Sequence, residues 1–259
     1  MHCRILYTSV MVNLPTIKSL KSHIKKLIIS SPRIVPGTEI GIGLNIVSLI
    51  CPLRYDLIIR IEFFRFLERE WDLYTNNLPS FLDAAPVKNY YIWFKEISIA
   101  RFNPDLYPHE NLIKPKFIEQ VHTAAALWKS LEDNGLDISN PICLMSGKEI
   151  IPVNGKITNE LYFAGDGCHR LSYLYVKGVR TLPPNYYQVI IYKKFQPLDN
   201  TDILYKKLPL STANYCKFIS SYYCNNLDLN TVDEILQYVD AYRHDLLPVI
   251  RSIVATIKE

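Results

Sequence analysis

The chain has 259 residues, of which 49% are hydrophobic and 21% are charged, a balance that excludes general disorder and is typical of a folded globular protein. Its formal net charge of +4 is mild, and acidic residues are nearly as numerous as basic ones, so a dedicated nucleic-acid-binding surface is not favoured. The most apolar stretch, residues 40–64, is interrupted by arginines and acidic residues, which are costly in a bilayer, so we expect no transmembrane segment.

The cysteines give no sign of a metal centre or a disulfide framework. They stand far apart, without a CxxC pair or a tight cluster with histidines, so a zinc site is not expected. The N-terminus lacks the charged, apolar and small-residue pattern of a secretory signal. We therefore expect a cytoplasmic protein with reduced thiols.

The first 88 residues are expected to form a helical N-terminal extension. Apolar residues recur at helical spacing from Leu14 to Ile29 and predict a short basic helix, whose lysines could contact an anionic surface or simply lie in solvent. Prolines and glycines between residues 36 and 43 indicate a loop or a weak strand. Large apolar side chains from Tyr55 to Tyr74 predict a helix of about five turns.

Residues 89–195 are expected to form the central domain. From Tyr90 to Ala100 the sequence is rich in aromatic and β-branched residues, which predicts a strand. From Lys116 to Asp133 apolar residues repeat at steps of four and three and predict a helix. The remaining predicted elements are strands at 141–145, 150–153, 156–158, 161–164 and 187–192, with a hairpin turn at Asn154-Gly155, and a helix from Leu171 to Gly178.

Residues 196–259 are expected to form a helical C-terminal extension. Thr231 and Glu234 have the spacing of a capping box in front of the apolar residues of a helix. Together the predicted elements indicate an α+β fold, with a small mixed sheet, packed helices and a helical extension at each end.

The segment Gly165-Asp166-Gly167-Cys168-His169-Arg170 joins a predicted strand to a predicted helix. Glycines in such a turn let backbone N–H groups at the helix start approach an anion, which the helix dipole also favours. Because His169 and Arg170 would place cations where that dipole disfavours them, their position suggests a bound phosphate. The same residues also suit a structural turn, in which Asp166 caps the helix and Arg170 lies in solvent.

Two segments resemble parts of a known superfamily. The run Asp166-Gly167-Cys168-His169-Arg170-Leu171 resembles the signature of the ParB/sulfiredoxin superfamily. The run Pro108-His109-Glu110-Asn111-Leu112 resembles a segment of the archaeal free serine kinases in that superfamily, with an approximate leucine spacing. The region they span is less than half of the chain, and the two segments occur in the expected order.

The resemblance implies a ParB/sulfiredoxin-like domain that binds ATP, ADP or CTP together with Mg²⁺. The backbone of Gly167, Cys168 and His169 would donate to the nucleotide phosphates, with Gly165 in the same cofactor-binding turn. His169 and Arg170 would complete the cofactor-binding set by neutralising the charge that develops during phosphoryl transfer. A nucleotide and a small-molecule acceptor are therefore the expected partners.

The activity that the resemblance implies is that of a kinase, which transfers a phosphoryl group to a small hydroxyl compound such as serine. Glu110 would accept the proton of the attacking hydroxyl, and His169 would assist catalysis. Asp166 would hold Mg²⁺ or share the acid–base task, because hard oxygen ligands suit that ion. Without the resemblance, Glu110 fits an exposed loop carboxylate or a favourable first-turn charge of the following helix.

Three other functions fit parts of the sequence. Gly-Cys-His-Arg also occurs in sulfiredoxins, where the cysteine is the nucleophile in the ATP-dependent reduction of a sulfinic acid, and Cys168 would take that role here. A ParB-like module would bind DNA under nucleotide control, but residues 200–259 show no convincing helix-turn-helix and no concentrated basic face. A non-catalytic nucleotide sensor would bind its ligand without turnover.

Overall fold

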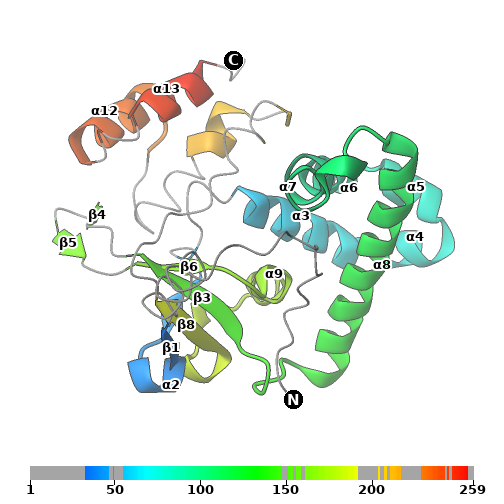
Figure 1. The fold of residues 1–259 in the computed structure, drawn as a ribbon, viewed down its shortest axis with the longest axis horizontal. Helices are drawn as coiled ribbons and strands as arrows, with labels where there is room; N and C mark the ends of the chain where they lie inside the picture. The colour runs from blue at the N-terminus through cyan, green and yellow to red at the C-terminus, as the bar shows by residue number, and fades with distance from the viewer. Residues whose placement is uncertain are drawn as a thin grey trace, which may run out of the picture.

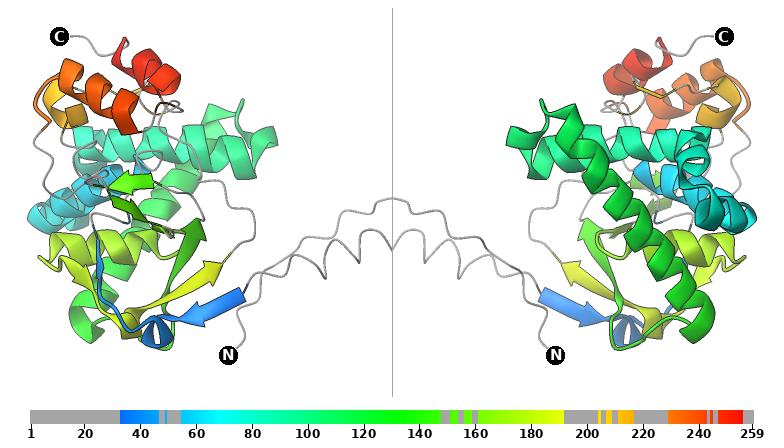
Figure 2. Two further views of the ribbon diagram at one scale, coloured as in Figure 1. Left: turned by 90° about the vertical axis from the view of Figure 1, so that its left-hand side faces the viewer. Right: turned by 90° about the vertical axis from the view of Figure 1, so that its right-hand side faces the viewer.

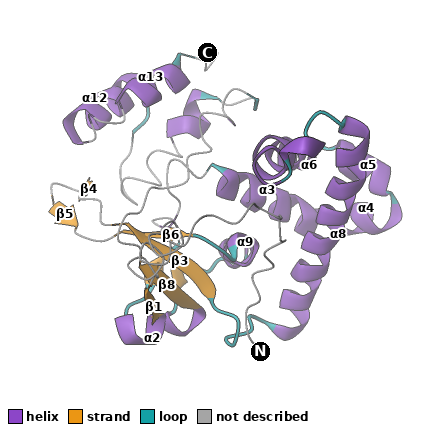
Figure 3. Cartoon of the chain, in the orientation of Figure 1, coloured by secondary structure: helices purple, strands orange, loops and turns teal. Residues whose placement is uncertain are grey.

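The computed structural model describes residues 33–46, 49, 55–147, 151–153, 156–158, 161–191, 204, 207–208, 211–216, 229–242, 244 and 247–255. A small mixed sheet lies beside a larger group of helices (Figure 1 and Figure 3), so the α+β prediction is confirmed. The helix predicted at 14–29 lies outside the described residues. Within the described ranges, no helix is long and apolar enough to cross a membrane.

The main sheet has four strands in the order β1-β8-β3-β6. They are β1 (Arg33–Pro36), β3 (Ile142–Gly147), β6 (Leu161–Ala164) and β8 (Tyr187–Ile191). The central strands β3 and β8 are parallel, and each outer strand is antiparallel to its neighbour. Two small ribbons pair β2 (Leu44–Asn45) with β7 (Thr181–Leu182) and β4 (Ile151–Val153) with β5 (Lys156–Thr158).

Helices account for most of the remaining described residues. Before the long helix α8 (Glu110–Asn134) come α2 (Gly37–Ile40), α3 (Asp56–Arg69), α4 (Trp71–Asn76), α5 (Leu78–Asp83), α6 (Ala85–Trp93), the π-helix η2 (Phe94–Ile99), α7 (Ala100–Phe102) and the 3-10 turn η3 (Pro104–Leu106). After it come α9 (Cys168–Val176), the 3-10 turn η4 (Pro184–Tyr186), α12 (Val232–Tyr242) and α13 (Leu247–Val254). The last two helices contact each other.

Helix α3 is central to the helical layer, because it contacts both α9 and α6. Phe63 and Phe64 of α3 are fully buried. Phe63 stacks on Tyr90 of α6 with ring centroids 4.5 Å apart, and Phe64 packs against Trp128 of α8. Figure 2 shows α9 between the sheet and α3, so the start of α9 is held between the two layers of the fold.

The strand predicted from Tyr90 to Ala100 is wrong. These residues form the end of α6, the π-helix η2 and the first residue of α7. Tyr90, Trp93 and Ile97 are buried, and their spacing of three and four places them on one helical face. Burial of that face outweighs the strand preference of single aromatic and β-branched residues, which depends strongly on context.

The expected domain boundary between residues 88 and 89 falls inside α6. Strand β1 comes from the segment expected to be a helical extension, yet it pairs with β8 in the main sheet. It is only four residues long and ends at Pro36. A short strand with a terminal proline is typical of a sheet edge and gives little periodicity for a sequence to reveal.

The loop or weak strand expected between residues 36 and 43 is wrong in part, because residues 37–40 form the helix α2 and only residues 41–43 are a loop. The remaining predicted elements that fall on described residues are confirmed. The helix at 55–74 is observed as α3 and α4, and the helix at 116–133 lies within α8, which begins earlier. The capping box is present at α12, where the N–H of Glu234 donates to Thr231 Oγ1 at 3.2 Å and the N–H of Thr231 donates to Glu234 Oε2 at 2.8 Å. The strands and the helix after the glycine turn also lie where predicted, as β3, β4, β5, β6, β8 and α9.

Candidate functional site

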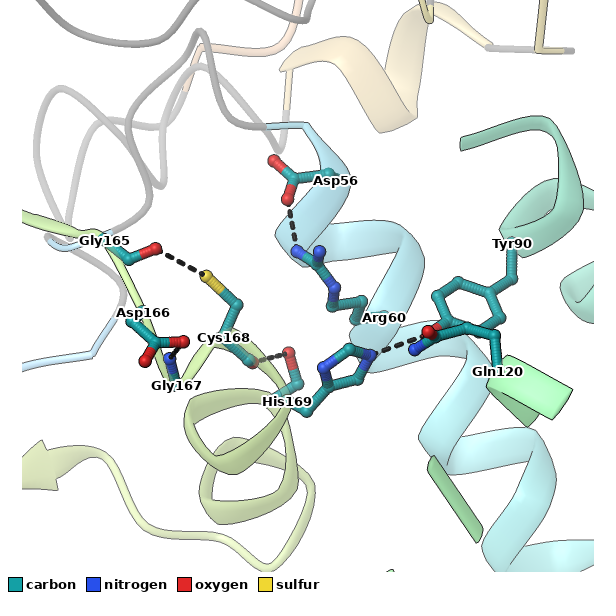
Figure 4. A network of polar contacts seen from close by, with 10 residues as sticks. Asp56, Arg60, Tyr90, Gln120, Gly165, Asp166, Gly167, Cys168 and His169 are labelled. Atoms are coloured by element: carbon teal, nitrogen blue, oxygen red, sulfur yellow. Dashed lines mark hydrogen bonds and ion pairs between the residues drawn. The ribbon is translucent and has the colours of Figure 1, made fainter. Parts of the chain in front are cut away.

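The segment from Gly165 to Arg170 forms a tight turn from β6 into α9 (Figure 4). The N–H groups of Gly165 and Asp166 both donate to the Cys143 carbonyl of β3, at 2.9 and 3.0 Å. A Cβ on Gly165 would lie 3.1 Å from the Met145 side chain and 3.2 Å from that carbonyl oxygen. Glycine is therefore favoured at the point where the turn passes over β3.

Gly167 is the N-cap of α9 and has a left-handed backbone, with φ of 79°. A Cβ there would lie 2.9 Å from a guanidinium nitrogen of Arg170, so both conformation and space favour glycine. No described side chain caps the helix, because Asp166 Oδ1 accepts from the N–H of Gly167 itself at 2.7 Å. The interpretation of Asp166 as the helix cap is therefore wrong, and the first turn of α9 keeps its anion-binding character.

A cavity of about 690 Å³ opens at this turn. All six residues from Gly165 to Arg170 line it. Other walls come from α3, through Asp56 and Arg60, and from α6 and η2, through Trp93 and Ile97. Small-molecule and cofactor sites usually have volumes of roughly 300–1,000 Å³, so the glycine turn forms one wall of a ligand-sized cavity.

His169 is held by a chain of hydrogen bonds. Its Nε2 lies 2.6 Å from the Tyr90 hydroxyl, which accepts a hydrogen bond from Gln120 Nε2 at 3.1 Å. The other described hydrogen-bond partners of this hydroxyl, Gln120 and Arg60, are donors. His169 Nε2 is therefore the acceptor for the Tyr90 proton, and the imidazole proton lies on Nδ1. Burial, aided by the positive charge of Arg60, lowers the pKa of His169 to about 3. At neutral pH His169 therefore offers a neutral N–H group, unlike the charge-neutralising role that the resemblance implies.

Arg170 does not lie free in solvent. Its guanidinium donates to the carbonyl oxygens of Asn140 and Pro141, the second at 3.4 Å. These bonds tie the start of α9 to the segment that leads into β3. Arg170 also lines the cavity, so its charge acts there while some of its donors serve the fold.

Glu110 is the first residue of α8 and is not among the described residues that line the cavity. Its carboxylate accepts hydrogen bonds from the Lys95 ammonium and the Tyr91 hydroxyl. These two donors, Lys95 first, lower the pKa of Glu110. The structure therefore does not bring Glu110 together with Asp166 in one cavity wall, and Glu110 instead fastens the start of α8 to α6 and η2.

Asp56 and Arg60 belong to the site but were not predicted as site residues. They form a buried ion pair one turn apart on α3. The Arg60 guanidinium lies over the ring of Trp93, 4.0 Å from its centroid. In the sequence the two residues only interrupt an apolar stretch. Opposite charges four residues apart in an apolar helix are the signal that could have found them, because charged residues are rarely buried unless paired.

Cys168 is buried at the start of α9, and its Sγ lies 3.8 Å from the Gly165 carbonyl oxygen. The described cysteines Cys143, Cys168 and Cys216 form no disulfide within the described part of the chain. No group of three His, Cys, Asp or Glu side chains that could hold a metal ion occurs in the described part of the chain. A divalent ion here would rest on Asp166 and on ligand oxygens, which is a usual arrangement for Mg²⁺ with nucleotides.

No protein-family model, curated protein or solved structure matches the chain. The resemblance to the ParB/sulfiredoxin superfamily therefore rests on the residues that carry it, at 166–171 and 108–112. Of these, residues 166–170 line the cavity, whereas Leu171 and Glu110 do not. The function has to be inferred from the geometry of the cavity.

Proposed function

We propose that this chain binds a nucleotide, with its phosphates at the start of α9, and transfers a phosphoryl group to a small hydroxyl compound. The observation that carries the proposal is that the complete turn from Gly165 to Arg170 lines a cavity of about 690 Å³. A ParB/sulfiredoxin-like fold for the domain is part of the same proposal. Serine is the acceptor that the motif resemblance suggests.

The start of α9 is suited to phosphate oxygens for two reasons. Gly167 removes the side chain that would keep an anion away from the backbone, and the uncapped N–H groups carry the partial positive charge of the helix dipole. Nδ1–H of His169 adds a neutral donor next to them. The positive charge on the cavity wall comes from Arg60 and Arg170.

Asp166 is the residue that would hold Mg²⁺, through one carboxylate oxygen, which leaves its second oxygen for the acid–base task. It is exposed and lines the cavity, and its Oδ1 is oriented by the N–H of Gly167. A single carboxylate is enough when phosphates supply further oxygens. When bound, the ion would neutralise charge on those phosphates.

In the proposed reaction, the acceptor oxygen forms a bond to the terminal phosphorus while the bond from that phosphorus to its bridging oxygen breaks. The nucleotide leaves with one phosphate fewer. The hydroxyl proton passes to Asp166, because the other described carboxylate in the cavity wall, Asp56, is engaged with Arg60. Glu110 takes no part in this step.

Incubation of the full chain with ATP, ADP or CTP, Mg²⁺ and a panel of hydroxyl amino acids and sugars tests the proposal. Asp166→Asn is expected to lower turnover about a hundredfold or more, the usual effect of losing a catalytic acid or base. Glu110→Gln is the matched control, an isosteric change away from the cavity, and should keep wild-type turnover. Absence of any phosphorylated product, or a larger loss in Glu110→Gln than in Asp166→Asn, would contradict it.

A thiol-dependent reaction is the second candidate, because Cys168 lines the same cavity. In the sulfiredoxin-like version, the Cys168 thiol would serve as nucleophile in the ATP-dependent reduction of a sulfinic acid on another protein. Cys168→Ser separates the two candidates. Phosphoryl transfer to a hydroxyl compound should survive this change, whereas sulfinic acid reduction should be abolished.

A further inference from the structure

We infer that Arg60 and Trp93 form an oxyanion-binding subsite on the cavity wall made by α3 and α6, separate from the start of α9. The inference rests on the proposed function and adds a subsite that the glycine motif does not contain. The group bound there would be a phosphate or a carboxylate of the ligand, since both present two or more anionic oxygens.

Both side chains hold a buried N–H group that lacks an acceptor anywhere in the described structure. These groups are Nε of Arg60 and Nε1 of Trp93. Arg60 is 6% exposed and Trp93 is 8% exposed, and both residues line the cavity. Buried donors are nearly always satisfied in folded proteins. Two unmet donors on side chains that line the same cavity therefore point to a ligand oxygen as the missing acceptor.

The Arg60 guanidinium is held in position from two sides. Asp56 accepts a hydrogen bond from its Nη1 (Figure 4), and the Trp93 ring lies 4.0 Å away. Trp93 is itself stacked on Tyr90, with the ring planes at 7°. An arginine fixed in this way loses little side-chain freedom on binding, and its planar donors match two oxygens of one phosphate or carboxylate.

The position of Arg60 also places it beside the glycine turn. Its charge contributes to the lowered pKa of His169, so the guanidinium lies close to the first turn of α9. The groups that face it are Asp56 on its own helix, Tyr90 on α6 and the neutral His169 on α9. A ligand that reaches from the start of α9 to Arg60 would therefore meet donors at both ends.

A purely structural role does not explain this placement. An ion pair in a protein interior adds little net stability, because the desolvation of both charges offsets their attraction. An apolar side chain at position 60 would pack on Trp93 without burying an unmet donor. By contrast, Arg69 at the other end of α3 is exposed and pairs with Glu70 at the surface.

Calorimetric titration of the full chain with pyrophosphate and with D-glycerate tests the subsite. Asp56→Asn combined with Arg60→Met removes both charges of the ion pair and leaves no buried charge unpaired. The affinity for at least one probe is expected to fall about tenfold or more, as for the loss of charged hydrogen bonds. Trp93→Phe keeps the ring and removes one neutral donor, so it should weaken the same probe about fivefold.

Arg69→Met is the matched control and should bind both probes as the wild-type chain does. A loss confined to pyrophosphate assigns the subsite to the nucleotide, and a loss confined to D-glycerate assigns it to the acceptor. Wild-type affinity for both probes in the folded double variant overturns the subsite, as does the absence of binding by the wild-type chain. If the double variant fails to fold, unchanged affinity in Trp93→Phe overturns it.

The proposed function is judged separately, by the formation of a phosphorylated product. Probe binding that depends on Arg60 without any such product would support the subsite and contradict the phosphotransferase. Formation of the product together with wild-type probe affinity in the variants would support the phosphotransferase and contradict the subsite. The two proposals therefore fail in different experiments.

Discussion

The Tyr90 hydroxyl lies 2.6 Å from Nε2 of His169, and this hydrogen bond joins α6 to the first turn of α9. Tyr90 is fully buried, and Gln120 of α8 donates to the same hydroxyl. Three helices therefore meet at one oxygen atom. Because Nε2 is the only acceptor among the described partners of this hydroxyl, the bond also sets the tautomer of the imidazole beside the cavity.

Tyr90→Phe should destabilise the fold by about 1–3 kcal/mol, because it leaves the buried Nε2 of His169 without a donor. The stacking on Phe63 would persist, since the ring is retained. Urea unfolding followed by circular dichroism measures the change. Tyr91→Phe is the matched control at the next residue, where the lost partner is the more exposed Glu110, and it should cost less than about 1 kcal/mol. Equal losses of unfolding free energy in the two variants would contradict the central role of Tyr90.

The neutral state of His169 should make stability depend on pH. Its pKa is about 3 in the folded chain against an ordinary 6.5, so the unfolded chain binds the additional proton between these values. The stabilising contribution is complete above the unfolded pKa and is lost as the pH falls toward the folded one. A fall from about pH 7.5 to about pH 5 should lower the free energy of unfolding by about 2 kcal/mol through this group alone.

Urea unfolding of the wild-type chain and of His169→Gln across that pH range isolates this contribution. Glutamine can still accept from Tyr90 but does not titrate, and the carboxylates are common to both chains. The wild-type chain should therefore lose more stability on acidification than the variant does. Parallel pH profiles would show that His169 titrates normally in the folded state.

Elements bounded by local signals could be predicted from the sequence. The β4–β5 hairpin follows from its turn residues, and the start of α12 follows from the spacing of Thr231 and Glu234. The strand-turn-helix order around Gly167 follows from the glycine itself. In each case the signal and the structure that it specifies lie within a few residues, so distant contacts have little power to change the outcome.

Partners that are distant in sequence could not be predicted in the same way. The strand preference of residues 90–100 yields to the burial of Tyr90 and Trp93, and that burial exists only because α3 packs against α6. Glu110 accepts a hydrogen bond from Lys95, which lies 15 residues earlier, too far for a local sequence pattern to predict the contact. The sequence therefore located the glycine turn, whereas the place of Arg60 in the neighbouring cavity wall depends on the packing of α3 and follows from the fold.

Gly167→Ala should destabilise the fold more than Gly178→Ala does. Both glycines have a left-handed backbone, with φ of 79° and 82°, so both alanines incur a conformational cost of roughly 1–2 kcal/mol. Only at position 167 would the new Cβ crowd its surroundings, at 2.9 Å from Arg170 and 3.2 Å from Ile142, whereas nothing lies within 4 Å at position 178. Thermal unfolding of the two variants measures the difference. Equal decreases in Tm would mean that Arg170 moves aside at no cost.

Arg170 should contribute more to the architecture of the site than to its charge. Its guanidinium donates to two carbonyls ahead of β3, so Arg170→Met should speed amide hydrogen exchange in residues 137–143, the segment that these bonds hold. Arg170→Lys should restore only part of the protection, because a single ammonium group does not reproduce the planar guanidinium fork.

Arg180→Met is the control for this experiment, because Arg180 donates to the Tyr175 carbonyl at 2.7 Å near the other end of α9. It removes a similar bond and the same charge without touching the segment before β3. Exchange in residues 137–143 should then stay at the wild-type rate. If both variants, or neither, speed exchange there, Arg170 is not what anchors the segment, and its guanidinium would be free to serve a ligand instead.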